Sequence, residues 1–151
     1  MTQTTANARR LLSLFERMRA TKMDGAISRL HALNLSFSHV RALHMLAAAP
    51  HLQMKDLAEK LGFTPPSVTA LTRRLVATGM VQRQPHADDS RVALLSLTDE
   101  GRALLADIYQ EQLKGMERLL DGLTPEEQAQ FLDLMERAVS TLVEGRSTGK
   151  H

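Results

Sequence analysis

Two acids and an arginine stand close together in the polar segment from His86 to Arg91, between the short runs MVQRQ and VALLSL. Asp89 and Arg91 are two residues apart, so their side chains project to the same side of an extended backbone. A carboxylate placed there can hold the guanidinium in one direction and lower the entropy cost of presenting it. An arginine presented in this way is attracted to negative potential, such as that of a DNA minor groove. The alternative is a solvated turn, because aspartate, serine and histidine are common turn residues.

A second group of candidate residues lies in the segment TPPSVTALTRRLVATG, which begins at Thr64. Thr64 is a suitable N-cap, Pro65 suits the first helical position, and Gly79 ends the segment. A helical wheel places Val68, Leu71, Thr72 and Leu75 inward, Pro66, Ala70, Arg73 and Ala77 on the opposite side, and Ser67 and Arg74 at its flank. Small side chains let a helix approach base edges in a major groove, and arginines reach guanine or phosphate. The alternative is a solvated surface helix.

The sequence contains no arrangement typical of an enzyme. No Ser/His/Asp order or carboxylate pair stands out, and the histidines are scattered, among them His31, His39, His44, His51 and His86. His44 falls on an apolar helical face with Val40, Leu43 and Ala47, where a buried structural histidine is more common than a ligand. The absence of cysteine excludes disulfides, thiolate metal sites and thiol redox switches. We therefore expect no catalytic residues, no metal and no cofactor.

The elements that must position these residues follow from apolar periodicity. In order, we expect a long helix from Ala6 to about Leu33, a helix capped by Ser36 or Ser38 that stops before Pro50, a short helix ending at Gly62, the helix after Thr64, the hairpin, and two helices capped by Thr98 and Thr124. Two short helices joined by a tight glycine-containing turn are the helix-turn-helix pattern. The expected fold class is mainly α with a small β-hairpin wing, a winged helix-turn-helix over residues 36–97.

The terminal helices carry apolar stripes that are broader than so small a middle block can cover. The stripes include Leu11, Leu14, Phe15, Met18, Ile27 and Leu30 in the first helix, Leu105, Ile108, Leu113, Met116, Leu119, Leu120 and Leu123 in the next to last, and Phe131, Leu134, Met135, Ala138, Val139 and Leu142 in the last. Unpaired apolar faces imply a partner, and the simplest partner is a second copy. We expect one domain over residues 1–151, in which residues 6–35 and 98–145 form a helical dimerisation part.

Composition narrows the class of protein further. The formal net charge of +2 permits nucleic-acid binding without requiring it. Aromatic residues make up only 3% of the chain, which argues against binding single strands by base stacking. No apolar run reaches the roughly 18 residues of a membrane span, and the N-terminus lacks the pattern of a signal peptide. We expect a cytoplasmic protein with no membrane partner.

The run LAEKLGFTPPSVTALTRRLVATGMVQRQPHADDSRVALLSLTDEGR closely resembles the winged helix-turn-helix of the multiple-antibiotic-resistance regulator (MarR) family. The most specific part is Asp89-x-Arg91, followed at the family's spacing by Leu94, Leu97, Thr98 and Gly101. The resemblance implies that Arg91 enters the minor groove and that Asp89 steadies the wing. The sequence departs from the family at Arg73, where family members often have an acid. This departure concerns which operator sequence is bound and not the fold.

The resemblance also implies a function. It predicts a homodimeric transcriptional regulator, a repressor, that binds an inverted-repeat operator in double-stranded DNA. The expected DNA-binding residues are Thr64, Pro66, Ser67, Thr69, Ala70, Arg73, Arg74, Asp89 and Arg91. A small aromatic or phenolic, anionic effector is expected where the terminal helices meet the winged part, and its wall residues by position are Met18, Lys22, His44 and Tyr109. The alternative is a winged-helix protein used only for protein contacts, which would show no salt-dependent DNA affinity.

Overall fold

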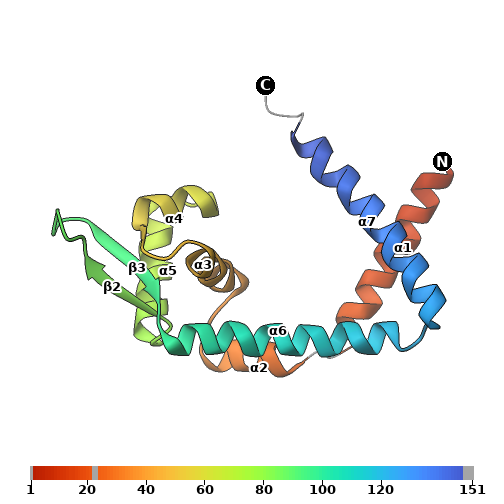
Figure 1. The fold of residues 1–151 in the computed structure, drawn as a ribbon, viewed down its shortest axis with the longest axis horizontal. Helices are drawn as coiled ribbons and strands as arrows, with labels where there is room; N and C mark the ends of the chain where they lie inside the picture. Colours follow the sequence, from red (N-terminus) through yellow and green to blue (C-terminus); the bar gives the residue numbers. More distant parts are fainter. Residues whose placement is uncertain (1, 22–23, 148–151) are drawn as a thin grey trace. The chain divides into compact units, whose positions relative to one another are not determined.

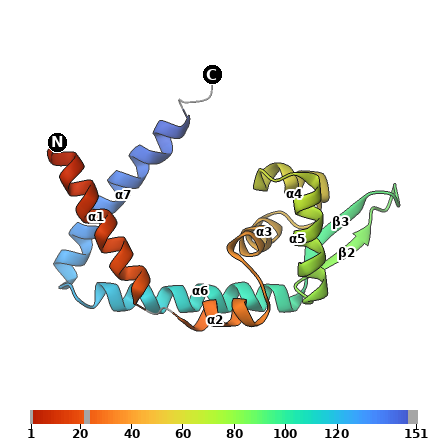
Figure 2. The ribbon, with the colours of Figure 1, turned by 180° about the vertical axis from the view of Figure 1, so that it is seen from behind.

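The computed structural model describes residues 2–21 and 24–147, and its ribbon is shown from two sides (Figures 1 and 2). The elements are α1 (Gln3–Ala20), α2 (Asp24–Ala32), α3 (Phe37–Ala48), β1 (Leu52–Gln53), α4 (Met54–Leu61), α5 (Pro65–Ala77), β2 (Val81–Pro85), β3 (Ala93–Leu97), α6 (Asp99–Leu120) and α7 (Pro125–Ser147). The chain forms two compact units, residues 1–112 and residues 113–151, and their boundary falls within α6.

The expected fold class is confirmed in the first unit, where α3, α4 and α5 pack with a small antiparallel sheet (Figure 1). The sheet has three strands in the order β1-β3-β2, whereas the sequence predicts only the hairpin. The additional strand pairs Leu52 with Leu95 and Gln53 with Leu94. A two-residue strand is too short to produce an alternating pattern, so it is defined only by its partner.

The largest fully enclosed core side chains of this unit come from five elements. The largest fully enclosed side chains include Leu43 of α3, Leu57 of α4, Leu75 of α5, Leu95 of β3 and Leu104 of α6. Each such side chain contributes roughly 1.5–3 kcal/mol by leaving water. This core fixes α5 against the sheet, which is what positions the candidate interface.

The buried face of α3 differs from the one expected. Val40, Ala42, Leu43 and Leu46 are buried, whereas His44 and Ala47 are exposed. The expectation that His44 is a core histidine is therefore wrong in this unit. The sheet and α4 pack against the side of α3 that Leu43 and Leu46 share, and the wheel of an isolated helix does not reveal which side that is.

The single helix expected from Ala6 to about Leu33 is two helices, α1 and α2. Helix α1 ends at Ala20, and Thr21 follows in an extended conformation with its N–H bonded to the Arg17 carbonyl. The Thr21 hydroxyl donates to the carbonyl of Met18 at 2.6 Å. A β-branched residue with a competing hydroxyl weakens helix propagation, which explains the end at this point. Helix α2 lies beside α6, where Arg29 pairs with Asp107 (Figure 1).

The predicted caps of the last two helices are confirmed. The Thr98 hydroxyl accepts the N–H of Gly101 at 3.1 Å at the start of α6. Before α7, the Thr124 hydroxyl accepts the N–H of Glu127, and the Glu127 carboxylate accepts the N–H of Thr124, so the two residues form a capping box. Across the described ranges, no helix is both long and apolar enough to cross a bilayer.

Candidate nucleic-acid interface

Helix α5 separates a buried side from an exposed side as the sequence predicts. Val68, Leu71, Thr72 and Leu75 are buried, with Val68 only 1% exposed. Pro66, Ser67, Ala70, Arg73 and Ala77 are exposed. A helix anchored by four inward side chains presents its outer side as a rigid surface, which is the requirement for reading a groove.

The start of α5 is fixed by the turn that precedes it. Gly62 ends α4 in the left-handed conformation with φ of 69°, which glycine adopts without strain. The Thr64 hydroxyl accepts the N–H of Ser67 at 3.4 Å and donates to the Ser67 hydroxyl at 2.9 Å. The Thr69 hydroxyl donates to the Pro65 carbonyl. These small polar side chains therefore lie ordered and accessible around the first turns of the helix.

The two arginines of α5 differ in their surroundings. Arg73 is exposed and has no hydrogen-bond or ion-pair partner among the described residues. Arg74 is half-buried, and its Nη2 donates to the carbonyl of Leu33 at 2.9 Å. The structure thus gives Arg74 a contact with the loop after α2, and its predicted DNA contact stays untested.

A further arginine shares the surroundings of Arg73. Arg83 of β2 is exposed, and it lines with Arg73 a hollow of about 220 Å³ between α5 and the sheet. Arg83 was not among the residues predicted from the sequence, although its place on a predicted strand of the hairpin was a usable signal. The hollow brings two cations from separate elements to one surface.

The expected pairing at the tip of the hairpin is confirmed, but its geometry is different. Arg91 donates from Nε to Oδ1 of Asp89 at 3.0 Å and from Nη2 to Oδ2 at 3.2 Å. The two residues lie in a turn and not in an extended strand: the Arg91 N–H also donates to Asp89 Oδ1, and the Val92 N–H donates to the Asp89 carbonyl. The turn, with His86 accepting the N–H of Asp88 through Nδ1, aligns the pair.

The electrostatics of the tip keep Asp89 charged. Hydrogen bonds from the Arg91 side chain, then from the Arg91 backbone, lower the pKa of Asp89 below its ordinary value. The Arg91 side chain is 89% exposed, whereas that of Asp89 is 38% exposed. The acid is therefore the inner, fixed member of the pair and the guanidinium is the outer one.

Three of the four predicted effector residues are described by the structure, and they lie on three different helices. Met18 is half-buried in α1, His44 is exposed on α3, and Tyr109 is exposed on α6. Lys22 lies outside the described residues. The proposed roles of all four stay predictions.

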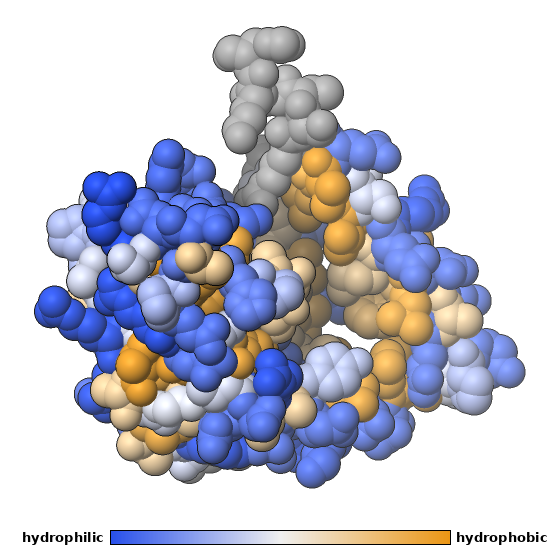
Figure 3. Space-filling view, turned by 60° about the vertical axis from the view of Figure 1, so that its left-hand side comes forward, coloured by the Kyte–Doolittle hydropathy of each residue, from blue (hydrophilic) through white to orange (hydrophobic). Residues whose placement is uncertain are grey.

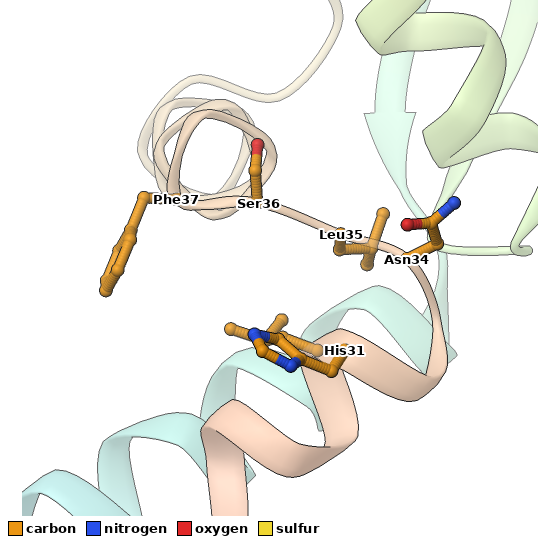
Figure 4. Close-up of a pocket in the computed structure, with 6 residues that line it drawn as sticks. His31, Asn34, Leu35, Ser36 and Phe37 are labelled. Atoms are coloured by element: carbon orange, nitrogen blue, oxygen red, sulfur yellow. The ribbon is translucent and has the colours of Figure 1, made fainter.

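A cleft that was not predicted from the sequence lies at the turn between α2 and α3. It measures about 510 Å³ and is lined by Leu30, His31, Asn34, Leu35, Ser36 and Phe37. His31 lies between the two helices in the close-up, and the Phe37 ring extends past the start of α3 (Figure 4). Phe37 is 76% exposed. An exposed aromatic directly after a cap was the only signal for this cleft in the sequence.

An anchored helix with an exposed outer side, a paired wing arginine and a small antiparallel sheet define a winged helix-turn-helix with a DNA-binding fold. Residues 33–92 match the pattern of the MarR family. The chain is 30% identical over 118 residues to the uncharacterized HTH-type transcriptional regulator YfiV of Bacillus subtilis (strain 168), and the match covers 76% of this chain and 74% of YfiV. It is 29% identical over 103 residues to YdgJ of the same organism, also an uncharacterized HTH-type transcriptional regulator, and that match covers 68% of this chain but less than two thirds (63%) of YdgJ.

Solved structures share the fold. YusO from Bacillus subtilis superimposes with a TM-score of 0.79 at 24% identity, covering 93% of this chain and 99% of YusO. MepR of S. aureus, in a complex with DNA, matches with a TM-score of 0.70 at 25% identity, covering 86% of this chain and 98% of MepR. The chain belongs to the MarR family of transcriptional regulators. It is a regulator with a DNA-binding fold and not an enzyme.

Proposed function

We propose that the protein is a repressor that binds an inverted-repeat operator as a homodimer and is released by a small effector. The observation that carries the DNA-binding part is the Asp89–Arg91 pair, because it presents a guanidinium in one fixed direction at an exposed tip. Arg91 then enters the minor groove while α5 occupies the adjacent major groove. Such a regulator acts on DNA in the cytoplasm.

The contacts divide into two kinds. The N-cap and the first turns of α5 carry side chains that are small enough to let the helix approach base edges. These residues are Thr64, Pro66, Ser67, Thr69 and Ala70. Arg73 and Arg83 line one hollow and supply charge for the phosphate backbone. We add Arg83 to the interface on this ground. We assign Arg74 to positioning α5, because its side chain is half-buried and its Nη2 donates to the Leu33 carbonyl.

The proposal of a homodimer rests on apolar side chains that are open to solvent in each unit. Leu11, Leu12, Leu14 and Phe15 are exposed in α1, and Phe131, Leu132, Leu134, Met135, Val139, Leu142 and Val143 are exposed in α7. Hydrophobic side chains are visible at the molecular surface in the space-filling view (Figure 3). Monomeric proteins rarely expose so many large apolar side chains together. A second copy that covers them would bury roughly 2,000 Å² or more, as in obligate dimers.

The effector is a small aromatic or phenolic anion in this proposal. The cleft at the turn between α2 and α3 supports such a ligand, because Phe37 offers an aromatic surface and His31 a polar group at its edge. In the same turn, the Leu33 carbonyl accepts a hydrogen bond from the guanidinium of Arg74. A ligand that moves this turn would therefore alter the seating of α5.

The test is a selection of bound genomic fragments followed by footprinting and binding measurements at several salt concentrations. An inverted repeat with half-sites about 10 bp apart, centre to centre, is expected, with affinity that falls steeply as salt rises. Sedimentation of the free protein at micromolar concentration should give a dimer. A stable folded monomer, or a single unrepeated site, would contradict the dimer. A lack of any salt-dependent DNA affinity would instead favour a winged helix used for protein contacts.

A further inference from the structure

A second polar cleft lies at the base of the wing, separate from the α5 surface and from the turn between α2 and α3. It measures about 410 Å³, and its lining includes His51 before β1, Gln82 of β2, Ser96 of β3 and Arg102 of α6. Leu46 of α3 and Leu97 of β3 form apolar parts of its wall. All of these residues belong to the first unit. We call this site the wing-base cleft.

The Ser96 hydroxyl is the feature that marks the cleft as a binding site. Ser96 is only 7% exposed, and its Oγ is buried without a hydrogen-bond partner among the described residues. An unsatisfied buried hydroxyl is costly, so native proteins nearly always provide it with a partner. Ser96 lines the cleft, so a molecule bound there can supply that partner once rotation of the side chain about χ1 opens the buried hydroxyl to it.

The charges around the cleft favour an anion. Arg102 and His51 are its ionisable lining residues, and no carboxylate is among the lining residues that the structure describes. Arg102 is held by Asp99 through Nη2 at 2.8 Å, while its Nη1 makes only a long contact of 3.5 Å with the Leu97 carbonyl. Part of the guanidinium is thus available, and a guanidinium binds carboxylates through two parallel hydrogen bonds.

We infer that the wing-base cleft binds a small organic carboxylate, with the carboxylate on Ser96 and Arg102 and a short apolar body against Leu46 and Leu97. The volume lies within the range of small-molecule sites, which combine apolar walls with a few polar groups. The ligand would join both strands of the hairpin to α3 and α6. Occupancy would therefore stiffen the base of the wing, whose tip carries Arg91. This effect on DNA rests on the proposed function, but the binding itself does not.

The direct test is titration of the full-length protein with cyclohexanecarboxylate, followed by amide chemical shifts in ¹H–¹⁵N spectra without DNA. We expect saturable shifts at Gln82, Ser96 and Arg102. The neutral cyclohexanecarboxamide and inorganic phosphate should each bind about 10-fold more weakly, since one loses the charge-assisted hydrogen bonds and the other the apolar contacts. Equal binding of the amide, tighter binding of phosphate, or shifts confined to other residues would overturn the inference.

Two variants localise the ligand. Ser96→Ala and Arg102→Gln should each weaken cyclohexanecarboxylate by about 10-fold. The matched control is Thr72→Val, which removes the other buried hydroxyl without a partner but lies outside the cleft, and it should bind like the parent. Ser96→Ala should melt at the same temperature as the parent or higher, because it deletes an unpaired group. Unchanged affinity in Ser96→Ala would overturn the inference even if Arg102→Gln failed to fold.

A second measurement separates this inference from the proposed function. Operator binding is compared with and without saturating cyclohexanecarboxylate in the parent and in Ser96→Ala. A change of about threefold or more in the parent alone would link the cleft to the wing. If the protein bound no operator at all while the amide shifts persisted, the proposed function would be contradicted and the site retained.

Discussion

Arg74 of α5 donates from Nη2 to the main-chain carbonyl of Leu33, 2.9 Å away and 41 residues earlier in the sequence. The contact ties α5 to the turn that leads from α2 into α3. His39 lies in the same region, and its Nδ1 accepts the N–H of Ser36 at 2.9 Å. The seating of α5 and the conformation of this turn are therefore coupled through one guanidinium.

The two neighbouring arginines of α5 should behave differently when they are removed. Arg73→Ala should weaken operator binding by about 1–3 kcal/mol per half-site with an unchanged melting temperature, since the side chain is exposed and unpaired within the described residues. Arg74→Ala should lower the free energy of unfolding by about 1–2 kcal/mol, because the Leu33 carbonyl loses its partner. Fluorescence anisotropy and thermal melting on both variants measure this. If Arg74→Ala melted normally and lost more operator affinity than Arg73→Ala, Arg74 would be the DNA contact and the two roles would be reversed.

The Asp89–Arg91 pair gives a second prediction, in which two variants differ in how much operator affinity they lose. Arg91→Ala should weaken operator binding by about 1–3 kcal/mol per wing without altering the melting temperature, because the tip has few core contacts. Asp89→Ala should weaken it less, since the carboxylate only directs the guanidinium and its removal also deletes a charge that repels phosphate. Anisotropy on one duplex at two salt concentrations checks both. If the turn were merely solvated, Asp89→Ala would bind more tightly than the parent.

A pH dependence of stability follows from His39. Partial burial, and then the positive charge of Arg74, lower the pKa of His39 below its ordinary value of 6.5. As the pH falls through 6.5, the unfolded chain takes up this proton before the folded one does, so the fold loses stability below that pH. Above it the imidazole is neutral in both states and contributes no slope.

The variant His39→Gln isolates this contribution. Glutamine at the third helical position can still accept the Ser36 N–H, as in a capping box, but it does not titrate. The loss of unfolding free energy between about pH 7.5 and about pH 5.5, measured by urea titration, should be smaller in His39→Gln by a fraction of a kcal/mol. The other histidines contribute equally to both proteins. An identical loss in the two would show that His39 carries no such linkage.

Gly101 sits where no side chain fits. A Cβ at this position would overlap the Met80 carbonyl oxygen and lie 3.2 Å from Leu97 Cδ2. The same carbonyl accepts the N–H of Thr98, so it cannot withdraw without loosening the start of α6. Gly101→Ala should therefore destabilise the fold by about 1–3 kcal/mol. The control is Gly145→Ala in α7, where a Cβ meets nothing within 4 Å, and thermal melting should show it to be neutral or slightly stabilising.

Several features of the protein were determined by the sequence alone. The inward side of α5 could be predicted because four anchoring residues recur at helical spacing, and a helix is set by neighbours three and four positions away. The caps at Thr64, Thr98 and Thr124 were predicted for the same reason, since each bonds to a backbone group within three residues. The Asp89–Arg91 pair is also local, although a turn and not a strand aligns it.

Other features were decided only by the tertiary structure, because they depend on groups distant in the sequence. Leu52 becomes a strand residue only beside Leu95, and Arg74, at the flank of α5, gains a hydrogen bond only because the Leu33 carbonyl lies nearby. The burial of Leu46 in place of His44 depends on which side of α3 meets the sheet. The local sequence pattern determines which secondary structure a segment can form. Whether an arginine of α5 stays exposed or forms a hydrogen bond depends on where the Leu33 carbonyl lies, and that position is set only when the core has folded.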